Sequence, residues 1–372
     1  MKSLGIEITP DTIRAALFDS TTQVLEQEKE YPFPPHLSGL PEAQVEVDPA
    51  AIVQTVLAAI NDLGGSVESD IEVWMTGRAG GVVLTDEMGR AKSNFVSWRD
   101  RRASQIAVMN KSHLERLADQ WIDPKFGTLR RELHASSMFA ILYTLADAEA
   151  LPDGVLPLTL PDFVVSHICR QPGRMHYSLG IGMLDFQTND WSYKALERAG
   201  LGDLWLPEIT LNLSHIGQVK SGKRTIYFRP PVSELQASLL GNRLTAKEIG
   251  LHFDHSPRIT TIQYGNGALS KLSVPYFEQQ RLLSVPLSDA VSPVDADNES
   301  LSEQKCRDLA LQCQAAAKSF IDLERFDSIL VSGASSYCCE QLATALSAQF
   351  NKNVRFSLPN AGLIGLLKLA QS

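Results

Sequence analysis

Short apolar runs alternate with helix-like segments along most of the chain, and this alternation restricts the fold more than any other feature. Residues 4–8 and 13–18 are apolar runs separated by Thr-Pro-Asp-Thr, a pattern that predicts a hairpin. Asp48 and Pro49 then start a segment whose apolar residues recur at helical spacing. Further predicted strands and helices follow at residues 71–76, 81–85, 301–321, 328–332, 338–350, 353–356 and 361–370. Such alternation predicts an α/β fold of mixed sheets covered by helices.

The length and charge of the chain indicate how many domains it has and which partners are disfavoured. A length of 372 residues favours two domains. The net charge is -9 and the sequence has no basic stripe, which argues against nucleic acid or a membrane as partner. No apolar run approaches the ~20 residues that cross a bilayer. The first residues pass directly into a predicted strand, so we expect no signal peptide.

The cysteines indicate a reducing compartment. There are five, with no Cys-x-x-Cys spacing, which is typical of reduced thiols and predicts a cytoplasmic protein. The adjacent Cys338 and Cys339 could form a redox pair, although neighbouring cysteines at a helix start are more often buried small residues.

A series of segments carries the most specific signal. They are Gly-Ile-Glu-Ile-Thr-Pro-Asp-Thr at 5–12, Met-Thr-Gly-Arg-Ala-Gly-Gly at 75–81, Ser-Trp-Arg-Asp-Arg-Arg at 97–102, Met-Leu-Asp-Phe-Gln-Thr-Asn-Asp-Trp-Ser at 183–192, Ile-Leu-Val-Ser-Gly-Ala-Ser at 329–335 and Pro-Asn-Ala-Gly at 359–362. In this order they resemble the motifs of the FGGY family of carbohydrate kinases, over nearly the whole chain. Residues 233–238 and 275–283 look closest to its sedoheptulokinase and xylulokinase-like members.

The resemblance implies a fold and an activity. The fold would be two actin-like (ribonuclease H-like) domains with a cleft between them. Residues 1–225 would form the sugar-side domain and residues 226–372 the nucleotide-side domain, shortened near residues 288–301. The implied activity is ATP-dependent phosphorylation of a ketose or polyol, with ATP and Mg²⁺ as cofactors.

The first phosphate loop of such a kinase would lie at Thr9, Pro10 and Asp11, with Glu7 as the metal-side carboxylate. Phosphoryl transfer needs positioned backbone donors and charge neutralisation. Pro10 has no N–H to donate, and a carboxylate at Asp11 would repel a triphosphate. An ordinary tight hairpin is the alternative, and it suits these residues better.

The rest of the nucleotide side departs from the family pattern in a similar way. The second phosphate loop corresponds to Asp254 and His255, where the family has glycines. Gly333, Ala334 and Asn360 would border the adenosine, and the methyl group of Ala334 would crowd it. Histidine and aspartate at 252–255 could instead bind a metal, but a third ligand is missing from the pattern.

The general base implied by the resemblance is Glu234, which stands where the family has an aspartate. A glutamate can serve as a base. Its extra methylene shifts the carboxylate, and a misplacement of ~1 Å can cost about 10²-fold in rate. The alternative is a solvent-facing acid at a helix N-terminus, where the helix dipole favours it.

The sugar side would be formed by two further segments. Arg78 and Ala79 in the glycine turn would contact the substrate, Trp98 would stack on a sugar face, and Asp100 and Arg101 would hydrogen-bond its hydroxyls. The alternatives are core packing for Trp98 and a salt bridge for Arg101. His134, His176 and Tyr177 are weaker candidates for the same site.

Two hypotheses follow, from different classes of protein. The first is a carbohydrate kinase whose phosphoryl transfer is weakened or lost. The second is a catalytically silent pseudokinase that binds a sugar-like ligand or a protein partner, with no cofactor and with a homodimer as an expected form. A third hypothesis, another actin-like ATPase, is disfavoured by the segments at 98–101 and 184–191.

Overall fold

The computed structural model describes residues 2–19, 22, 24–108, 110–185, 188–253, 257–263, 273–277, 280–287, 301–333 and 339–371. Its contacts divide the chain into two compact units. Unit 1 comprises residues 1–237 and 362–372, and unit 2 comprises residues 238–361. No helix in the described part of the chain is long and apolar enough to cross a membrane.

The main sheet of unit 1 is built on the predicted hairpin. Its strands are β1 (Lys2–Ile8), β2 (Thr12–Asp19), β3 (Val24–Pro32), β5 (Ile71–Gly77), β15 (Gly217–Ser221), β16 (Arg224–Phe228) and β17 (Val232–Ser233). The order is β15-β16-β5-β1-β2-β3, and β17 extends the β16 side by pairing with β5. The pairs β1–β2 and β2–β3 are antiparallel, whereas β1–β5 and β5–β16 are parallel.

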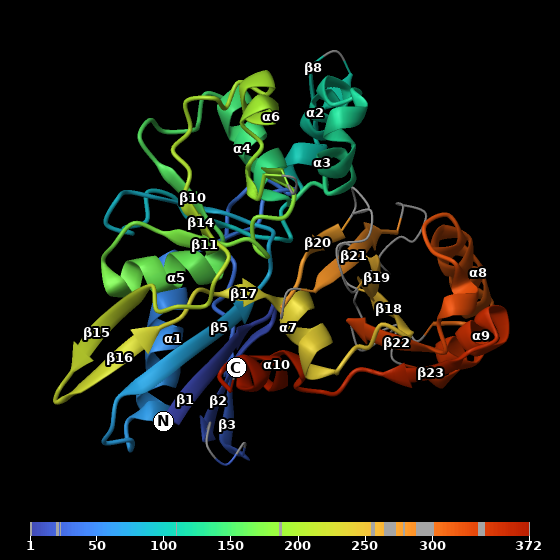
Figure 1. The fold of residues 1–372 in the computed structure, drawn as a ribbon. Helices are drawn as coiled ribbons and strands as arrows, with labels where there is room; N and C mark the ends of the chain where they lie inside the picture. The colour runs from blue at the N-terminus through green and yellow to red at the C-terminus, as the bar shows by residue number, and fades with distance from the viewer. Residues whose placement is uncertain are drawn as a thin grey trace. The chain divides into compact units, whose positions relative to one another are not determined.

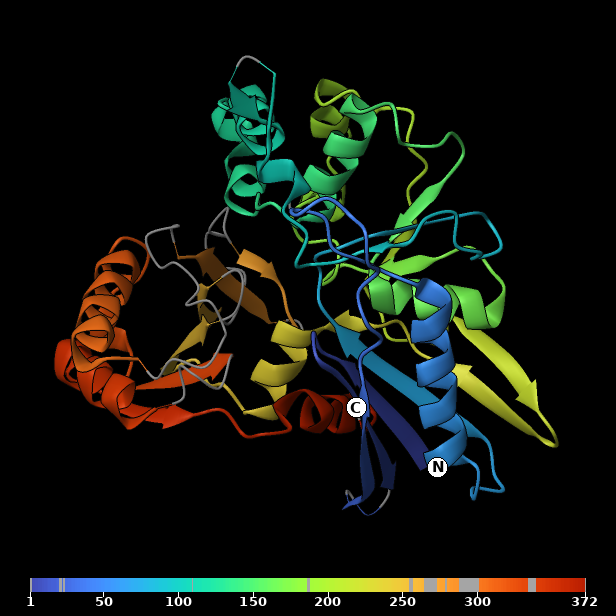
Figure 2. The same ribbon diagram turned by 180° about the vertical axis from the view of Figure 1, so that it is seen from behind.

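Helices cover both faces of this sheet because its strands are apolar on both sides. Helix α1 (Pro49–Gly64) packs with α5 (Leu160–Cys169) over Leu4, Ile6 and Ile8 of β1. Helix α10 (Ala361–Leu369) lies on the opposite face, where Leu363 approaches Gly5 (Figures 1 and 2). Asp48 caps α1 by accepting a hydrogen bond from the Ala50 amide, as its position before Pro49 predicts.

A second layer of unit 1 has its own apolar core. Its helices are α2 (His113–Gln120), α3 (Gly127–Arg131), α4 (Met138–Asp147) and α6 (Tyr193–Arg198). Its short strand pairs are β4 (Glu46–Val47) with β7 (Phe95–Val96), β6 (Val83–Thr85) with β10 (Leu156–Leu158), β8 (Ile106–Val108) with β9 (Lys111–Ser112), β11 (Arg174–His176) with β14 (Glu208–Thr210), and β12 (Leu184–Asp185) with β13 (Asp190–Trp191).

Unit 2 repeats the order and directions of five strands of the unit 1 sheet, β3-β2-β1-β5-β16. Its strands are β18 (Glu248–Phe253), β19 (Arg258–Gln263), β20 (Ser273–Pro275), β21 (Arg281–Pro286), β22 (Ser328–Gly333) and β23 (Asn353–Phe356), in the order β20-β21-β19-β18-β22-β23. As in unit 1, a hairpin and a third antiparallel strand are followed by two parallel strands. Helices α8 (Glu303–Lys318) and α9 (Glu340–Phe350) pack against this sheet. The predicted α/β class with two domains of one topology is confirmed.

The division into units differs from the expected boundary at residue 225. Residues 226–237 group with unit 1 because β16 and β17 pair with β5. Residues 362–372 do so because α10 packs against β1. The chain passes from unit 1 to unit 2 within α7 (Glu234–Gly241) and returns to unit 1 at the start of α10.

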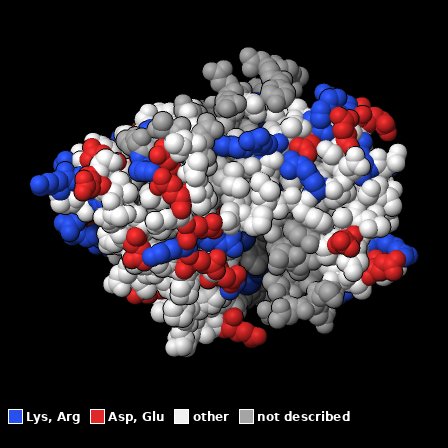
Figure 3. Space-filling model, turned by 90° about the horizontal axis from the view of Figure 1, so that it is seen from below, with Lys and Arg blue, Asp and Glu red and all other residues white. Residues whose placement is uncertain are grey.

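The described surface carries charges of both signs. On the face seen in Figure 3, Lys and Arg side chains lie close to Asp and Glu side chains. This mixture agrees with a net charge of -9 carried by 34 basic and 43 acidic residues.

Candidate active site

Three strands of unit 1 bring charged residues together at their carboxyl ends. In the parallel register Glu7 of β1 lies beside Thr76 of β5, and Thr76 lies beside Val232 of β17. Arg78 and Glu234 directly follow β5 and β17. Open α/β sheets bind ligands outside the carboxyl ends of their strands. The sheet therefore places Glu7, Arg78 and Glu234 where a ligand of this fold is expected.

Glu234 and Arg78 form an ion pair at this edge. The Arg78 Nε lies 3.2 Å from Glu234 Oε2, and the side chains are only 16% and 21% exposed. Glu234 is also the first residue of α7. A general base must accept a proton from a substrate hydroxyl. In this arrangement the guanidinium of Arg78 already donates a hydrogen bond to one of the two carboxylate oxygens of Glu234.

Glu7 is the most perturbed acid of the site. It is 5% exposed, and its Oε2 lies 3.7 Å from Arg14 Nη1. Its Oε1 faces the first turn of α10, so closely that a β-carbon at Gly362 would lie 1.9 Å from it. Burial first, and then the charge of Glu234, raise the pKa of Glu7 from 4.5 to about 7, although Arg14 opposes the rise. A fraction of Glu7 is therefore protonated at neutral pH.

The surroundings of Glu7 do not suit a protein-bound metal ion. Magnesium prefers octahedral oxygen ligands that keep several waters. One oxygen of Glu7 faces Arg14 and the other packs against Gly362. Within the described ranges no group of three or more His, Cys, Asp or Glu residues is arranged to hold a metal. The described residues thus give no support to Glu7 as a metal ligand.

The turn at Thr9 is a closed hairpin connection. The Thr9 amide and hydroxyl both donate to the Thr12 carbonyl, at 2.9 and 2.8 Å, and the Thr12 amide donates to Thr9 Oγ1 at 3.1 Å. Asp11 is exposed and pairs with Arg99 Nη2 at 2.7 Å. The Thr9 donors are used inside the turn and Pro10 has none. These bonds fit the tight hairpin that the sequence offered as the alternative.

Trp98, expected to stack on a sugar, lies in the core instead. It is 2% exposed and packs on the rings of Phe33 and Phe95, at centroid distances of 5.7 and 5.0 Å. A ring this deeply buried has no open face for a sugar. The core-packing alternative is therefore correct for this residue.

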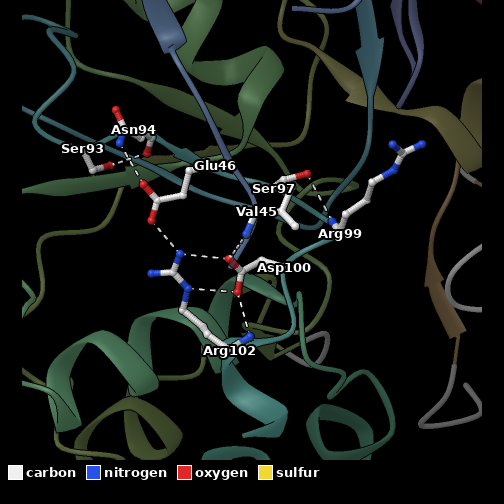
Figure 4. Close-up of polar contacts among 8 residues, drawn as sticks. All are labelled: Val45, Glu46, Ser93, Asn94, Ser97, Arg99, Asp100 and Arg102. Carbon is white, nitrogen blue, oxygen red and sulfur yellow. Dashed lines mark hydrogen bonds and ion pairs between the residues drawn. The ribbon is translucent and has the colours of Figure 1, made fainter. Parts of the chain in front are cut away.

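Asp100 is also structural (Figure 4). Its carboxylate is fully buried and accepts hydrogen bonds from the Val45 amide at 2.8 Å and from the Arg102 amide, Nε and Nη2, each at 2.9 Å. Arg102 also pairs with Glu46 at 2.6 Å. These bonds use both oxygens of Asp100, so they leave the carboxylate committed to the fold rather than to sugar hydroxyls.

Arg102 is the residue that the sequence interpretation missed. The prediction named Arg101, which is partly exposed and whose main-chain amide donates to the Ala43 carbonyl at 2.8 Å. The spacing Trp-x-Asp-x-Arg points to Arg102 when it is counted from Trp98. The signal for the salt bridge was therefore present in the motif, one position further along.

The remaining candidates of unit 1 lie beside or within its second core. Ala79 packs against this core. His176 is buried, its Nδ1 lies 2.8 Å from Ser178 Oγ, and burial lowers its pKa to about 3. Tyr177 is also buried. His134 Nδ1 lies 3.2 Å from Ser136 Oγ. Of this group, His176 and Tyr177 are core residues.

The residues predicted to border the adenosine and the second phosphate loop belong to unit 2, and the structure describes only some of them. Gly333 ends β22 with φ +109°, and a β-carbon there would lie 1.9 Å from the Phe253 carbonyl oxygen. This position requires glycine. Asn360 is partly buried. Asp254, His255 and Ala334 lie outside the described residues.

Comparisons with known proteins give a consistent result at the level of structure. Neither a protein-family model nor a curated protein matches the sequence. Gluconate kinase from Lactobacillus acidophilus matches with a TM-score of 0.75 and 14% identity, over 100% of this chain and 88% of that chain. Xylulose kinase from Rhodospirillum rubrum matches with 0.75 and 13%, over 100% and 91%. Glycerol kinase from Plasmodium falciparum, solved with ADP, matches with 0.73 and 13%, over 99% and 88%. The chain therefore has the two-domain, actin-like fold of the carbohydrate kinases that its ordered motifs resemble.

Proposed function

We propose that this chain is a carbohydrate-kinase-like protein in which phosphoryl transfer is lost or strongly weakened and which binds a small sugar or polyol. The observation that carries the proposal is the closed turn at Thr9 to Thr12, in the position of the first phosphate loop. The amide and hydroxyl of Thr9 donate within the turn, as does the Thr12 amide, and Pro10, which follows Thr9, has no N–H.

The loss of such donors has a large expected cost. Phosphoryl transfer depends on positioned donors and metal ions that offset the charge of the transferred group. Removal of a single preorganised donor costs roughly 10²–10³-fold in rate. A carboxylate at Asp11 adds a charge of the same sign as the triphosphate. Together these changes support very slow turnover or none.

The ligand side of the proposal rests on Arg78 and Glu234. They lie at the carboxyl ends of β5 and β17, and both side chains are partly exposed. Paired charged groups of this kind can exchange their mutual contact for hydrogen bonds to ligand hydroxyls. Trp98 and Asp100 contribute to this side only by supporting the fold. A cytoplasmic location and a homodimer belong to the same proposal.

An active kinase is the second candidate, and one observation favours it. Glu234 is a partly exposed carboxylate at the strand edge where a base is needed, and it could take the proton of an attacking hydroxyl once Arg78 moves away. ATP with Mg²⁺ would then supply the phosphoryl group. A contact between Arg78 and a ligand would be needed to release Glu234.

Two measurements on the full-length protein test the proposal. The first is ADP formation from Mg-ATP with a panel of pentuloses, heptuloses and polyols, for the wild type, Glu234→Ala and the exposed control Glu42→Ala. We expect all three to remain at the background rate. Turnover in the wild type and in Glu42→Ala that disappears in Glu234→Ala would establish the active kinase and refute the proposal.

The second measurement is the unfolding midpoint with each compound, because a ligand that binds only the native state must raise it. We expect a sugar or polyol to raise the midpoint and Mg-ATP at millimolar concentration to leave it unchanged. Stabilisation by Mg-ATP would contradict the loss of the phosphate site. If no sugar or polyol raises the midpoint, the proposed ligand class is wrong.

A further inference from the structure

Two thiols of unit 2 are neighbours where two helices pack side by side. Cys306 lies in the first turn of α8 and is fully buried. Cys339 is the N-cap residue of α9 and is partly exposed. The two thiols lie close enough to interact electrostatically, and Cys339 packs against the apolar core of unit 2 that contains Cys306. Both helices are seen at the C-terminal, orange-to-red part of the ribbon in Figure 1.

We propose that Cys306 and Cys339 are a modification site, and that a peroxide or a low-molecular-weight disulfide converts them to a reversible disulfide. A disulfide needs two cysteines whose side chains already approach one another, because a larger separation requires the backbone to move. The proximity of the two thiols, where α8 packs against α9 in one apolar core, favours this condition. The proposal is independent of any sugar or nucleotide site.

Unequal access to the two thiols sets the order of the steps. Hydrogen peroxide reaches the partly exposed Cys339, whose thiolate attacks one peroxide oxygen, forms a sulfenic acid and releases hydroxide. The sulfur of Cys306 then loses its proton, attacks the sulfur of Cys339 and displaces a second hydroxide. In total, two thiols and one peroxide give one disulfide and two molecules of water.

The environment of Cys306 protects it until the second step. Burial is the main cause that raises the pKa of the Cys306 thiol to about 11, and the neighbouring Cys339 adds to the rise. A thiol that is neutral and covered reacts slowly with free oxidant. It can still react with the sulfur of a neighbouring side chain, and the rate should increase with pH as its thiolate fraction increases.

Other cysteines of the chain serve as controls. Cys313 lies on α8, and burial alone raises its pKa to about 12. Cys169 ends α5 in unit 1. Cys338 precedes Cys339 but lies outside the described residues. A bond between Cys338 and Cys339 is therefore the competing outcome that the experiment must separate from the proposed one.

The cross-link would have a defined structural effect. It would join the first turn of α8 to the start of α9, the two helices that pack on the unit 2 sheet. It would close a loop that includes β22. A bond of this kind restricts the unfolded chain, so we expect the oxidised protein to unfold at a higher temperature than the reduced protein.

Peptide mapping of the full-length protein tests the proposal. The protein is treated with hydrogen peroxide, or separately with oxidised glutathione, then unfolded, alkylated with iodoacetamide, digested without reduction and examined by mass spectrometry. We expect a linked peptide pair containing Cys306 and Cys339, lighter by two hydrogen atoms than the two reduced peptides and separated by dithiothreitol. Recovery of Cys306 in alkylated form, or a bond between Cys338 and Cys339, would overturn the proposal.

Variants sharpen the assignment. Cys338→Ser, the matched control, should keep the cross-link, whereas Cys306→Ala and Cys339→Ser should lose it. In Cys306→Ala the sulfenic acid of Cys339 should persist and be trapped by dimedone. If Cys306→Ala does not fold, peptide mapping of the oxidised wild-type protein still shows whether Cys306 and Cys339 are linked, since that experiment needs no substitution.

Discussion

Replacement of Glu7 by glutamine should remove a large pH dependence from the stability of unit 1. The pKa of Glu7 is about 7 in the folded chain and returns to its ordinary value of 4.5 on unfolding. Between these values the folded state holds a proton that the unfolded state has released. Stability therefore falls as the pH rises through this window. The difference corresponds to about 3 kcal/mol, fully lost above pH 7. Glutamine resembles the protonated acid and does not titrate, so Glu7→Gln should escape this loss.

The chain offers a local probe for the measurement. Its five tryptophans, at positions 74, 98, 121, 191 and 205, all lie in unit 1. Trp74 is paired with Gly5 in the same sheet as Glu7. Denaturant unfolding followed by tryptophan fluorescence at pH 5 and pH 8.5 thus reports on this unit. The wild type should lose about 3 kcal/mol more than Glu7→Gln between the two pH values.

A control and a refuting result are both available. Glu42 is exposed, so Glu42→Gln should show the same pH dependence as the wild type. Other titrating groups contribute equally to all three proteins and cancel in the comparison. If the wild type and Glu7→Gln lose the same free energy of unfolding between pH 5 and pH 8.5, Glu7 does not titrate near neutrality, and the account of a buried acid beside Glu234 is wrong.

Three further predictions use the same fluorescence assay. Asp100→Ala should lower the free energy of unfolding by about 3–5 kcal/mol, because it removes one of the two carboxylates that pair with the buried Arg102; wild-type stability would contradict this. Gly362→Ala should lower it by about 1–3 kcal/mol because the new methyl meets Glu7 Oε1, whereas Gly127→Ala, in open space, should cost nothing; equal effects would refute the clash. The pKa of Asp162 is raised well above its ordinary value by burial, so Asp162→Asn should reduce the loss of stability above pH 4, and an unchanged pH profile would refute that shift.

The sequence predicts the fold well because local patterns determine most of it. The hairpin of β1 and β2, the cap of α1 and the alternation near the C-terminus all follow from residue spacing. The limits of the two units do not follow in this way. Pairing of β16 with β5 joins residues more than 150 positions apart, and no local pattern records such a partner.

The sequence predicts which residue types form the candidate site, but it does not predict which of these residues pair with one another. The resemblance singled out Glu234 and Arg78 separately, but their ion pair depends on β17 lying beside β5. A tryptophan such as Trp98 can stack on a sugar or pack in a core. An aspartate such as Asp100 can bind sugar hydroxyls or form a buried ion pair. Only burial separates these alternatives, and burial is a property of the three-dimensional packing.

Two of the buried acids of unit 1, Asp100 and Glu7, differ in what they do for the fold. Asp100 lies among donors that use both of its oxygens, so its burial is compensated. Glu7 has one distant guanidinium and a neighbouring carboxylate, and at neutral pH its burial costs stability. An acid that destabilises its own fold at the carboxyl end of a strand is expected where function, rather than stability, selects the residue. A ligand that brings positive charge or hydrogen-bond donors to Glu7 would remove this cost, and binding would then weaken as the pH falls below 7 and Glu7 is protonated.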